Sequence, residues 1–328
     1  MKSLVIGYGS IGKRHIENLS KFNNMHISVC TKRKKDKFLR ENNCVVFSSI
    51  DDAIKTNPDF AIISNETSLH ANIAKKLIKS KINFFVEKPI SHTMAELGPI
   101  LNSVKKNNLV TQVGCNYRFN PFLKEIKNLI GKGILGHIIS VQAENGSYLP
   151  EWHPNEDYRQ SYAGRKEFGG GVVFTCIHEL DILYWLFGKA SRVFSITGKY
   201  SDLKINADDL SVIILQFPKN IIGEIHLDFF QKPPSRYLKI IGTKGTLFWD
   251  FSTKKLMFFN SKTNKWIVKL HLKNYNTNDM YVEELKHFIN CVKNNTKTIN
   301  PISIGIEVLK IALYVKKSSE IRKMISIN

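Results

Sequence analysis

The amino-acid sequence predicts an α/β fold in which an N-terminal doubly wound parallel sheet precedes a second α/β domain with a mostly antiparallel sheet. Short apolar strand-like segments alternate with helix-like segments over residues 1–120, and this alternation is typical of parallel strands joined by right-handed crossovers. Longer strand-like segments, some separated only by short turns, occupy much of residues 121–328, which favours antiparallel pairing. We therefore expect one domain at 1–120 and a second at 121–328.

Composition is that of a globular protein and excludes disordered and fibrous classes. The chain has 328 residues, of which 43% are hydrophobic and 23% charged, enough for two cores. Its formal net charge is +20, from 48 Lys+Arg against 28 Asp+Glu. Most of the basic residues are lysines spread along the chain, which indicates a solvated surface more than a nucleic-acid interface.

Cysteine usage and hydropathy indicate a cytoplasmic protein without a metal centre. The five cysteines include no C-x-x-C pair, so no disulfide framework or zinc site is predicted. Free thiols suit a reducing cytosol. The first residues, 1–6, are typical of a strand rather than a signal peptide, and no apolar run of about 18 residues predicts a membrane span.

A glycine-rich turn follows the first strand. The apolar segment Leu4–Ile6 leads directly into a G-x-G-x-x-G motif and then into a helix pattern. The motif comprises Gly7, Tyr8, Gly9, Ser10, Ile11 and Gly12. Its first glycine permits the tight turn, the second lets the backbone approach a pyrophosphate, and the third lets helix and strand pack closely. Together with the helix N-terminus, this arrangement predicts dinucleotide binding.

The remaining elements of the first domain follow from the same alternation. The expected strands are 26–30, 45–47, 60–64, 83–86 and 110–113, and the expected helices are 34–40, 51–56, 68–80 and 93–106. Ligands bind at the carboxyl ends of such strands.

The end of the second strand bears on the choice of cofactor. An acid there binds the ribose 2′-OH of NAD, whereas a base tolerates the 2′-phosphate of NADP. This strand continues into Thr31, Lys32 and Arg33, and Asp36 comes several residues later. We therefore expect NAD(P), with a preference for NADP; the alternative is that the two bases only begin a solvated helix.

Three further motifs follow the glycines in order. They are N-x-T-x-x-H at Asn65, Thr67 and His70, E-K-P at Glu87–Pro89, and N-Y-R-F-x-P from Asn116 to Pro121. In this order they closely resemble the glucose–fructose oxidoreductase / inositol dehydrogenase / rhizopine-catabolism (Gfo/Idh/MocA) family of NAD(P)-dependent oxidoreductases, across essentially the whole chain. The resemblance implies a Rossmann domain, with Asn65, Thr67 and His70 lining the cofactor cleft and Glu87 near the nicotinamide ribose.

Lys88 is the first candidate catalytic residue. It stands at the carboxyl end of a predicted strand, and Pro89 biases it toward an extended conformation. Such a lysine can orient a hydroxyl and move its proton if its pKa is lowered. The family resemblance implies the same role.

In the second half we expect a helix at 122–130, strands at 137–144, 192–199, 210–217, 223–230, 237–241 and 246–250, and helices at 280–294 and 303–317. The resemblance implies a large open sheet, one face of which carries the active site. The other face often forms a homodimer or homotetramer interface, and the last helix returns to the Rossmann domain.

His178 is the second candidate catalytic residue. It follows three glycines, Gly169–Gly171, and shares a helix face with Asp181, three residues on. A histidine beside an acid titrates near neutrality, as a general base for a hydroxyl must. The family places its catalytic histidine in such a stretch. Many members carry an aspartate three or four residues earlier, where this chain has Phe174 and Thr175. Asp181 or Glu179 is therefore the expected partner of His178, and Asp181 is the third candidate catalytic residue.

The segment 148–165 is aromatic, basic and loop-like, which suits a sugar substrate. With the preceding motif it supplies the candidate substrate contacts Arg118, Trp152, Arg159, Tyr162 and Arg165. The segment resembles the subgroup that acts on sugars of surface polysaccharides, including acidic or nucleotide-linked ones.

The sequence thus predicts an enzyme that transfers a hydride between nicotinamide and a hydroxyl or keto carbon of a sugar. Two alternatives stay open: an enzyme that retains NAD for a net non-redox step such as glycoside cleavage, and a non-catalytic dinucleotide sensor. A nucleic-acid role is the weaker third reading, and no membrane partner is expected.

Overall fold

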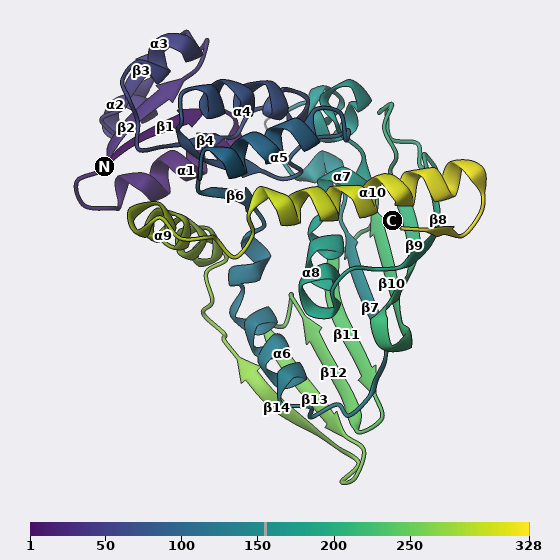
Figure 1. Ribbon diagram of the computed structural model, residues 1–328. Helices are drawn as coiled ribbons and strands as arrows, with labels where there is room; N and C mark the ends of the chain where they lie inside the picture. The colour runs from purple at the N-terminus through teal and green to yellow at the C-terminus, as the bar shows by residue number, and fades with distance from the viewer. Residues whose placement is uncertain (154–155, 328) are drawn as a thin grey trace. The chain divides into compact units, whose positions relative to one another are not determined.

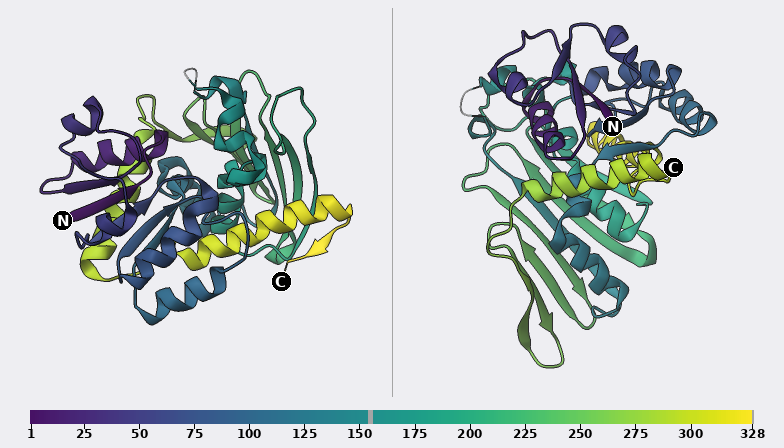
Figure 2. Two further views of the ribbon diagram at one scale, coloured as in Figure 1. Left: turned by 90° about the horizontal axis from the view of Figure 1, so that it is seen from above. Right: turned by 90° about the vertical axis from the view of Figure 1, so that its left-hand side faces the viewer.

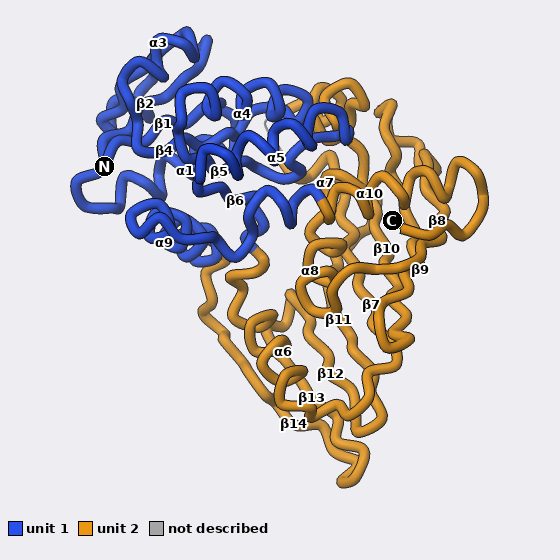
Figure 3. Tube along the Cα trace, in the orientation of Figure 1, with its two compact units in different colours: residues 1–116, 278–306 blue, residues 117–277, 307–328 orange. Residues whose placement is uncertain are grey.

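The computed structural model describes residues 1–153 and 156–327. The chain forms two compact units, each made of two segments (Figure 3). Unit 1 comprises Met1–Asn116 and Asn278–Ile306, and unit 2 comprises Tyr117–Thr277 and Glu307–Asn328. The following paragraphs treat each unit by itself.

Unit 1 is built on a six-stranded parallel sheet. Its strands are β1 (Lys2–Ile6), β2 (His26–Cys30), β3 (Val45–Phe47), β4 (Phe60–Ile63), β5 (Asn83–Glu87) and β6 (Thr111–Gly114). Their order is β3-β2-β1-β4-β5-β6, and every neighbouring pair is parallel. The strand order reverses between β1 and β4, which is where doubly wound sheets bind ligands. The predicted fold of this half is confirmed.

Helices cover both faces of this sheet, as the apolar strands require (Figure 1). They are α1 (Ser10–Ser20), α2 (Lys37–Glu41), α3 (Ile50–Ile54), the 3₁₀ turn η1 (Thr67–Leu69), α4 (His70–Lys79), α5 (Leu97–Lys106) and α9 (Asn278–Asn294). A core joins Val5 of β1, Ile16 of α1, Phe85 of β5 and Phe288 of α9. Helix α9 was expected in the second domain, yet its apolar side chains complete the core of unit 1.

Unit 2 is built on a nine-stranded sheet. Its strands are β7 (Ile138–Gly146), β8 (Arg192–Gly198), β9 (Leu210–Phe217), β10 (Ile221–Asp228), β11 (Ser235–Gly242), β12 (Gly245–Asp250), β13 (Lys255–Asn260), β14 (Lys265–His271) and β15 (Ile325–Ser326). Their order is β14-β13-β12-β11-β7-β10-β9-β8-β15. All neighbours are antiparallel except β7 and β10, so the expected mostly antiparallel sheet is confirmed. Strands β13, β14 and β15 were not predicted.

Helices pack on one face of this sheet (Figure 1 and Figure 2). They are α6 (Pro121–Gly131), α7 (Val172–Thr175), α8 (His178–Phe187) and the unit 2 part of α10 (Ile302–Ile321). Phe122 of α6 stacks on Trp249 of β12 at 6.2 Å between ring centroids. Leu183 of α8 lies over Gly223 of β10, where an added Cβ would meet it at 3.1 Å. Short 3₁₀ turns occur among the described residues between β7 and α7.

In the described part of the chain, no single helix is long and apolar enough to cross a membrane, although the bent pair Lys166–Thr175 and His178–Phe187 meets the length and composition criteria together.

Candidate active site

The glycine motif forms an open cradle at the start of α1. Gly7 has a φ of +108°, and a Cβ there would lie 2.7 Å from the backbone nitrogen of Asn65. A Cβ at Gly12 would lie 2.3 Å from the Gly7 carbonyl oxygen, whereas nothing lies within 4 Å of a Cβ at Gly9. Gly9 is also the N-cap of α1 and provides no side-chain cap. The first N–H groups of the helix thus face space that suits a pyrophosphate.

Asn65 provides a second indication of a polar ligand. It follows β4, and its side-chain oxygen and nitrogen are both buried without a hydrogen-bond partner among the described residues. A buried amide in that state is costly unless a water or ligand completes it. The neighbouring Thr67 is buried at the start of η1. Asn65 also lies beside Gly7, so its amide suits a polar ligand at the glycine cradle, while the role predicted for Thr67 stays a prediction.

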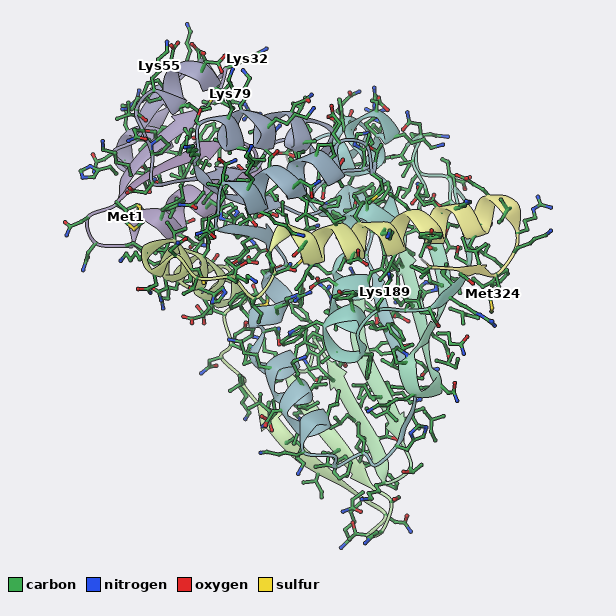
Figure 4. The ribbon with its side chains drawn as sticks, in the orientation of Figure 1. Met1, Lys32, Lys55, Lys79, Lys189 and Met324 are labelled. Atoms are coloured by element: carbon green, nitrogen blue, oxygen red, sulfur yellow. The ribbon has the colours of Figure 1, made fainter. Side chains whose placement is uncertain are left out.

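After β2, Asp36 lies closer to the glycine motif than the sequence suggested. Thr31 accepts a hydrogen bond from the Arg33 backbone at 3.1 Å, and Lys32 and Arg33 are exposed, with Lys32 extending from the surface (Figure 4). Asp36 was expected too far along the chain to matter. Instead its carboxylate accepts from the Tyr8 hydroxyl at 2.8 Å, which places an acid against the glycine motif.

Protonation at this contact follows from its hydrogen bonds. The Leu39 N–H and the Tyr8 hydroxyl donate to Asp36 and hold the pKa of its carboxyl below the usual value. Burial, together with the Asp36 carboxylate, raises the pKa of Tyr8. Asp36 is therefore charged at neutral pH, and Tyr8 stays a donor to it.

The E-K-P turn lies at the carboxyl end of β5. Glu87 is buried, and its Oε1 lies 2.7 Å from Nε2 of His15 on α1. Its Oε2 accepts from the backbone N–H of Lys88 at 3.3 Å. Lys88 is half-buried. On the other side of the turn, His70 Nδ1 lies 2.9 Å from the Pro89 carbonyl oxygen. The predicted residues Glu87, Lys88 and His70 thus form one structure at this edge of the sheet.

In unit 2, His178 begins α8 after a glycine-rich approach. Gly171 has a φ of +105°, and a Cβ at Gly170 would lie 2.0 Å from the Tyr162 carbonyl oxygen, so the chain needs both glycines. The Gly171 N–H donates to the Ala163 carbonyl at 2.8 Å, which ties the loop 148–165 to this turn. His178 is half-buried, and its ring centroid lies 5.1 Å from that of Tyr117.

The two acids that the sequence offered as partners for His178 are each bound to an arginine. Both carboxylate oxygens of Asp181 accept from Arg118, at 2.9 and 2.7 Å, and this pair is almost fully buried. Glu179 forms an ion pair with Arg236. Burial raises the pKa of Glu179, and Arg236 opposes that shift. Asp181 and Arg118, predicted as a catalytic residue and a substrate contact, therefore lie together in the interior.

Arg236 is a site residue that sequence reasoning missed. Its guanidinium lies 3.6 Å from the centroid of the Tyr117 ring, next to His178. It pairs across β7 and β11 with Asn145, whose side chain donates to Glu179 at 3.4 Å. The sequence did contain an indication of this role. Side chains alternate between the two faces of a strand, so Arg236 lies on the same face as the buried Leu238 and Ile240, where an apolar residue is expected. The predicted strand began one residue too late to include it.

The predicted substrate loop presents its aromatic and basic side chains at intermediate to high exposure. Trp152 donates from its indole to Ser147 at 2.8 Å, and Tyr162 is 36% exposed. Arg159 pairs with Asp157 at 2.8 Å, and Arg165 pairs with Glu167 at 2.6 Å. The arginines expected to bind an anion are therefore each paired with an acid two residues away in the chain.

The described residues contain no cluster of side chains that could bind a metal ion. Across residues 1–153 and 156–327, no three His, Cys, Asp or Glu side chains gather so that they could hold an ion.

Comparison with known proteins relates both halves of the chain to one family of oxidoreductases. Residues 1–115 match the model described as "Oxidoreductase family, NAD-binding Rossmann fold", and residues 123–248 match the "GFO/IDH/MocA C-terminal domain". The chain is 26% identical to the myo-inositol 2-dehydrogenase of Thermotoga maritima, over 100% of this chain and 98% of that protein. It is also 26% identical to the 2,7-anhydro-N-acetylneuraminate hydratase of Escherichia coli, over 74% of this chain and 67% of that protein.

Among solved structures, a levoglucosan dehydrogenase in complex with NADH superposes with a TM-score of 0.90 at 17% identity, covering 100% of this chain and 99% of that one. That likeness concerns the fold. The two family models between them match both halves of the chain, in the order glycine cradle and then His178 segment. The chain therefore belongs to the GFO/IDH/MocA family of oxidoreductases, with an NAD-binding Rossmann domain.

Proposed function

We propose that the protein is an NAD-dependent dehydrogenase of a neutral sugar or polyol. The observation that carries the proposal is the cradle at Gly7, Gly9 and Gly12, which leaves open space at the uncapped start of α1. The T. maritima relative acts on an inositol by its name, which supports the substrate class. A dinucleotide bound at the cradle supplies the hydride chemistry.

Lys88 and His178 are the groups proposed to handle the hydroxyl proton. Oxidation of a carbinol removes a hydride from carbon and a proton from oxygen, so a base must take the second. Lys88 orients the hydroxyl from the E-K-P turn, and His178 takes or returns the proton. The Tyr117 ring packs beside the His178 ring, and the Arg236 guanidinium lies over Tyr117.

For the cofactor we propose NAD, and the lean toward NADP from Lys32 and Arg33 finds no support. The charged Asp36 carboxylate lies at the Tyr8 hydroxyl, beside the glycine motif. An acid in that place favours a ribose hydroxyl over a phosphate.

Asp36→Ala is expected to improve kcat/KM with NADP relative to NAD by about tenfold, because it removes a charge that repels the 2′-phosphate. Unchanged selectivity in steady-state assays would remove Asp36 from this role.

For the substrate we propose a neutral molecule in preference to the acidic or nucleotide-linked sugars that the loop composition favoured. Four arginines of unit 2 each have a carboxylate partner, in the pairs Arg118–Asp181, Arg236–Glu179, Arg159–Asp157 and Arg165–Glu167. These arginines therefore add no net charge to attract an anion.

A substrate panel tests the proposal. NADH formation is followed at 340 nm with inositols, neutral hexoses, uronic acids and nucleotide-linked sugars. We expect turnover with a neutral member and weaker turnover with its uronic counterpart. Faster turnover of the uronic acid would overturn the neutral assignment, and no turnover of any member, with NADH bound, would overturn the dehydrogenase.

A second candidate is a net non-redox reaction with retained NAD. Two observations favour it: Phe174 and Thr175 stand where many members carry an aspartate, and the E. coli relative is a hydratase by its name. It predicts that NAD survives purification and that product forms, as seen by NMR, without a net absorbance change at 340 nm.

We also propose that the protein is a homo-oligomer through the uncovered face of the nine-stranded sheet. Apolar side chains on that face are 38–51% exposed in four cases: Ile196, Val212, Ile214 and Ile222. Isolated apolar residues are ordinary on surfaces, but a contiguous patch indicates an interface.

Light scattering coupled to gel filtration is expected to give the mass of a dimer or tetramer, and Ile214→Lys is expected to shift the protein to a monomer.

The cytoplasmic location predicted from cysteine usage is kept as a proposal, supported by five free thiols in the structure.

A further inference from the structure

Two buried histidines bind the E-K-P turn from opposite sides. His15 is fully buried on α1, and its Nε2 lies 2.7 Å from Oε1 of Glu87. Its ring also meets the edge of Phe85 at 5.2 Å between centroids, which fixes its orientation. The other oxygen of Glu87 accepts from the Lys88 backbone. The Glu87 carboxylate thus connects α1 to the backbone of Lys88.

The second histidine holds the residue on the far side of Lys88. His70, at the start of α4, is 1% exposed. Its Nδ1 lies 2.9 Å from the Pro89 carbonyl oxygen, and its Nε2 lies 3.0 Å from the Asn65 carbonyl oxygen. The neutral ring donates to one of these carbonyls and the imidazolium to both. His70 therefore ties the loop after β4 to the loop after β5.

We propose that His15 and His70 are positioning residues that clamp the Glu87–Pro89 turn and so set the place of the Lys88 side chain. The proposal rests on the dehydrogenase function proposed above. Each histidine makes a polar contact of 3.0 Å or less with the turn, His15 with the Glu87 carboxylate and His70 with the Pro89 carbonyl oxygen. An orienting group misplaced by about 1 Å costs about a hundredfold in rate, so fixing the residues on either side of Lys88 has a kinetic consequence.

The clamp also links Lys88 to the dinucleotide loops. The helix that carries His15 begins at the glycine cradle, at Ser10. His70 follows the segment that begins with Asn65, whose amide has no partner among the described residues. Each histidine therefore connects the turn to one of the two loops.

The test uses paired variants of the full-length protein. His15→Leu and His70→Leu remove the polar contacts at similar volume, and His15→Gln and His70→Gln keep a donor. His26→Gln, at an exposed position on β2, is the matched control. We expect kcat to fall about 10- to 100-fold in the leucine variants, with partial recovery in the glutamine variants. KM for the sugar and Kd for NADH, from its fluorescence, should stay within about twofold, because both histidine rings are buried against the turn and the change displaces Lys88 without removing a ligand contact.

A second readout does not need turnover. Reductive methylation with ¹³C-formaldehyde labels the lysines, and the Lys88 resonance is assigned by its loss in Lys88→Arg. We expect this resonance to move in the leucine variants and to stay in place in His26→Gln. A Lys88 resonance that is unchanged in both leucine variants, with thermal stability retained, overturns the clamp.

The two proposals fail in different ways. If the wild-type protein binds NADH and oxidises no sugar in the panel, the dehydrogenase function fails while the Lys88 resonance still decides the clamp. If turnover is present and unchanged in all four histidine variants, the clamp fails alone. Should a leucine variant not fold, its glutamine counterpart decides the outcome through the same resonance.

Discussion

At the scale of single residues, the arginines of unit 2 are where the structure differs most from the prediction made from the sequence. A loop rich in arginine and aromatic residues suggested an anion site. The structure pairs each of those arginines with a carboxylate, Arg159 with Asp157 and Arg165 with Glu167. A bidentate arginine–carboxylate contact is equally suited to holding a loop and to holding a substrate, so composition alone does not distinguish the two.

Asp181→Asn is expected to destabilise the fold strongly. It leaves the Arg118 guanidinium buried beside a neutral amide, and breaking a buried pair costs about 3–5 kcal/mol. Urea unfolding followed by circular dichroism measures the change. The control is Arg159→Ala, which removes an exposed pair and should leave the unfolding free energy nearly unchanged. A stable Asp181→Asn protein that has lost turnover would instead support the catalytic role first predicted for Asp181.

His70 is expected to make stability depend on pH. Burial lowers the pKa of His70 and outweighs the opposing effects of the Asn65 and Pro89 carbonyls and of Glu87. Because the unfolded chain takes up the proton more readily, the stabilising contribution is present above about 6.5, the unfolded pKa, and is lost as pH falls from there through the lower pKa of the folded protein. Unfolding free energies at pH 7.5 and 5.5 should differ less in His70→Gln than in wild type. A larger difference in the variant would contradict this sign.

At the scale of elements, the strand–turn–helix of β1 and α1 shows which glycines serve the fold and which serve the ligand. Gly12 is in contact with the backbone of Gly7, whereas Gly9 borders open space with an ordinary φ of −82°. The sequence motif treats all three glycines alike, so their separate roles emerge only from what surrounds each Cβ position.

Substituting these two glycines by alanine should separate stability from binding. Gly9→Ala is expected to change the unfolding free energy by less than about 0.5 kcal/mol, yet weaken NADH binding, because its methyl group occupies space at the helix start. Gly12→Ala is expected to cost about 1–3 kcal/mol through the clash with Gly7. Thermal denaturation and NADH fluorescence titration measure the pair. Equal effects of the two substitutions on binding would contradict the assignment of Gly9.

At the scale of the whole molecule, the net charge of +20 belongs mostly to the surface. Lys32, Lys55 and Lys79 extend outward in the structure (Figure 4), and Lys55 is 76% exposed in its side chain. Diffuse surface charge attracts polyanions only weakly and is screened beyond about 10 Å at 0.1 M salt.

Duplex DNA is therefore expected to bind weakly and without sequence preference. Fluorescence anisotropy with a labelled duplex should detect any binding at about 50 mM salt, and this binding should be lost by about 200 mM. Binding that persists at the higher salt concentration and distinguishes sequences would revive the nucleic-acid role.

Much of the fold was predictable because it follows from local patterns. The strands of unit 1 are short apolar runs that alternate with helices, so their positions match the prediction within one or two residues per strand. The parallel pairing of β7 with β10 was not predictable, because 138–146 and 221–228 meet across a long stretch of chain. Strand β14, with most of its residues exposed, lacks the apolar alternation that reveals a strand.

Local sequence was enough to define the Rossmann sheet, the glycine cradle, the E-K-P turn and the family, because each is encoded in consecutive residues whose backbone needs are local. Which charges neutralise one another depended instead on the packing of the chain. Asp181 faces Arg118, Asp36 reaches Tyr8, and Arg236 lies over Tyr117. Such contacts join residues far apart in the chain, and side chains of one type serve fold and ligand equally, so only their positions in space separate the two roles.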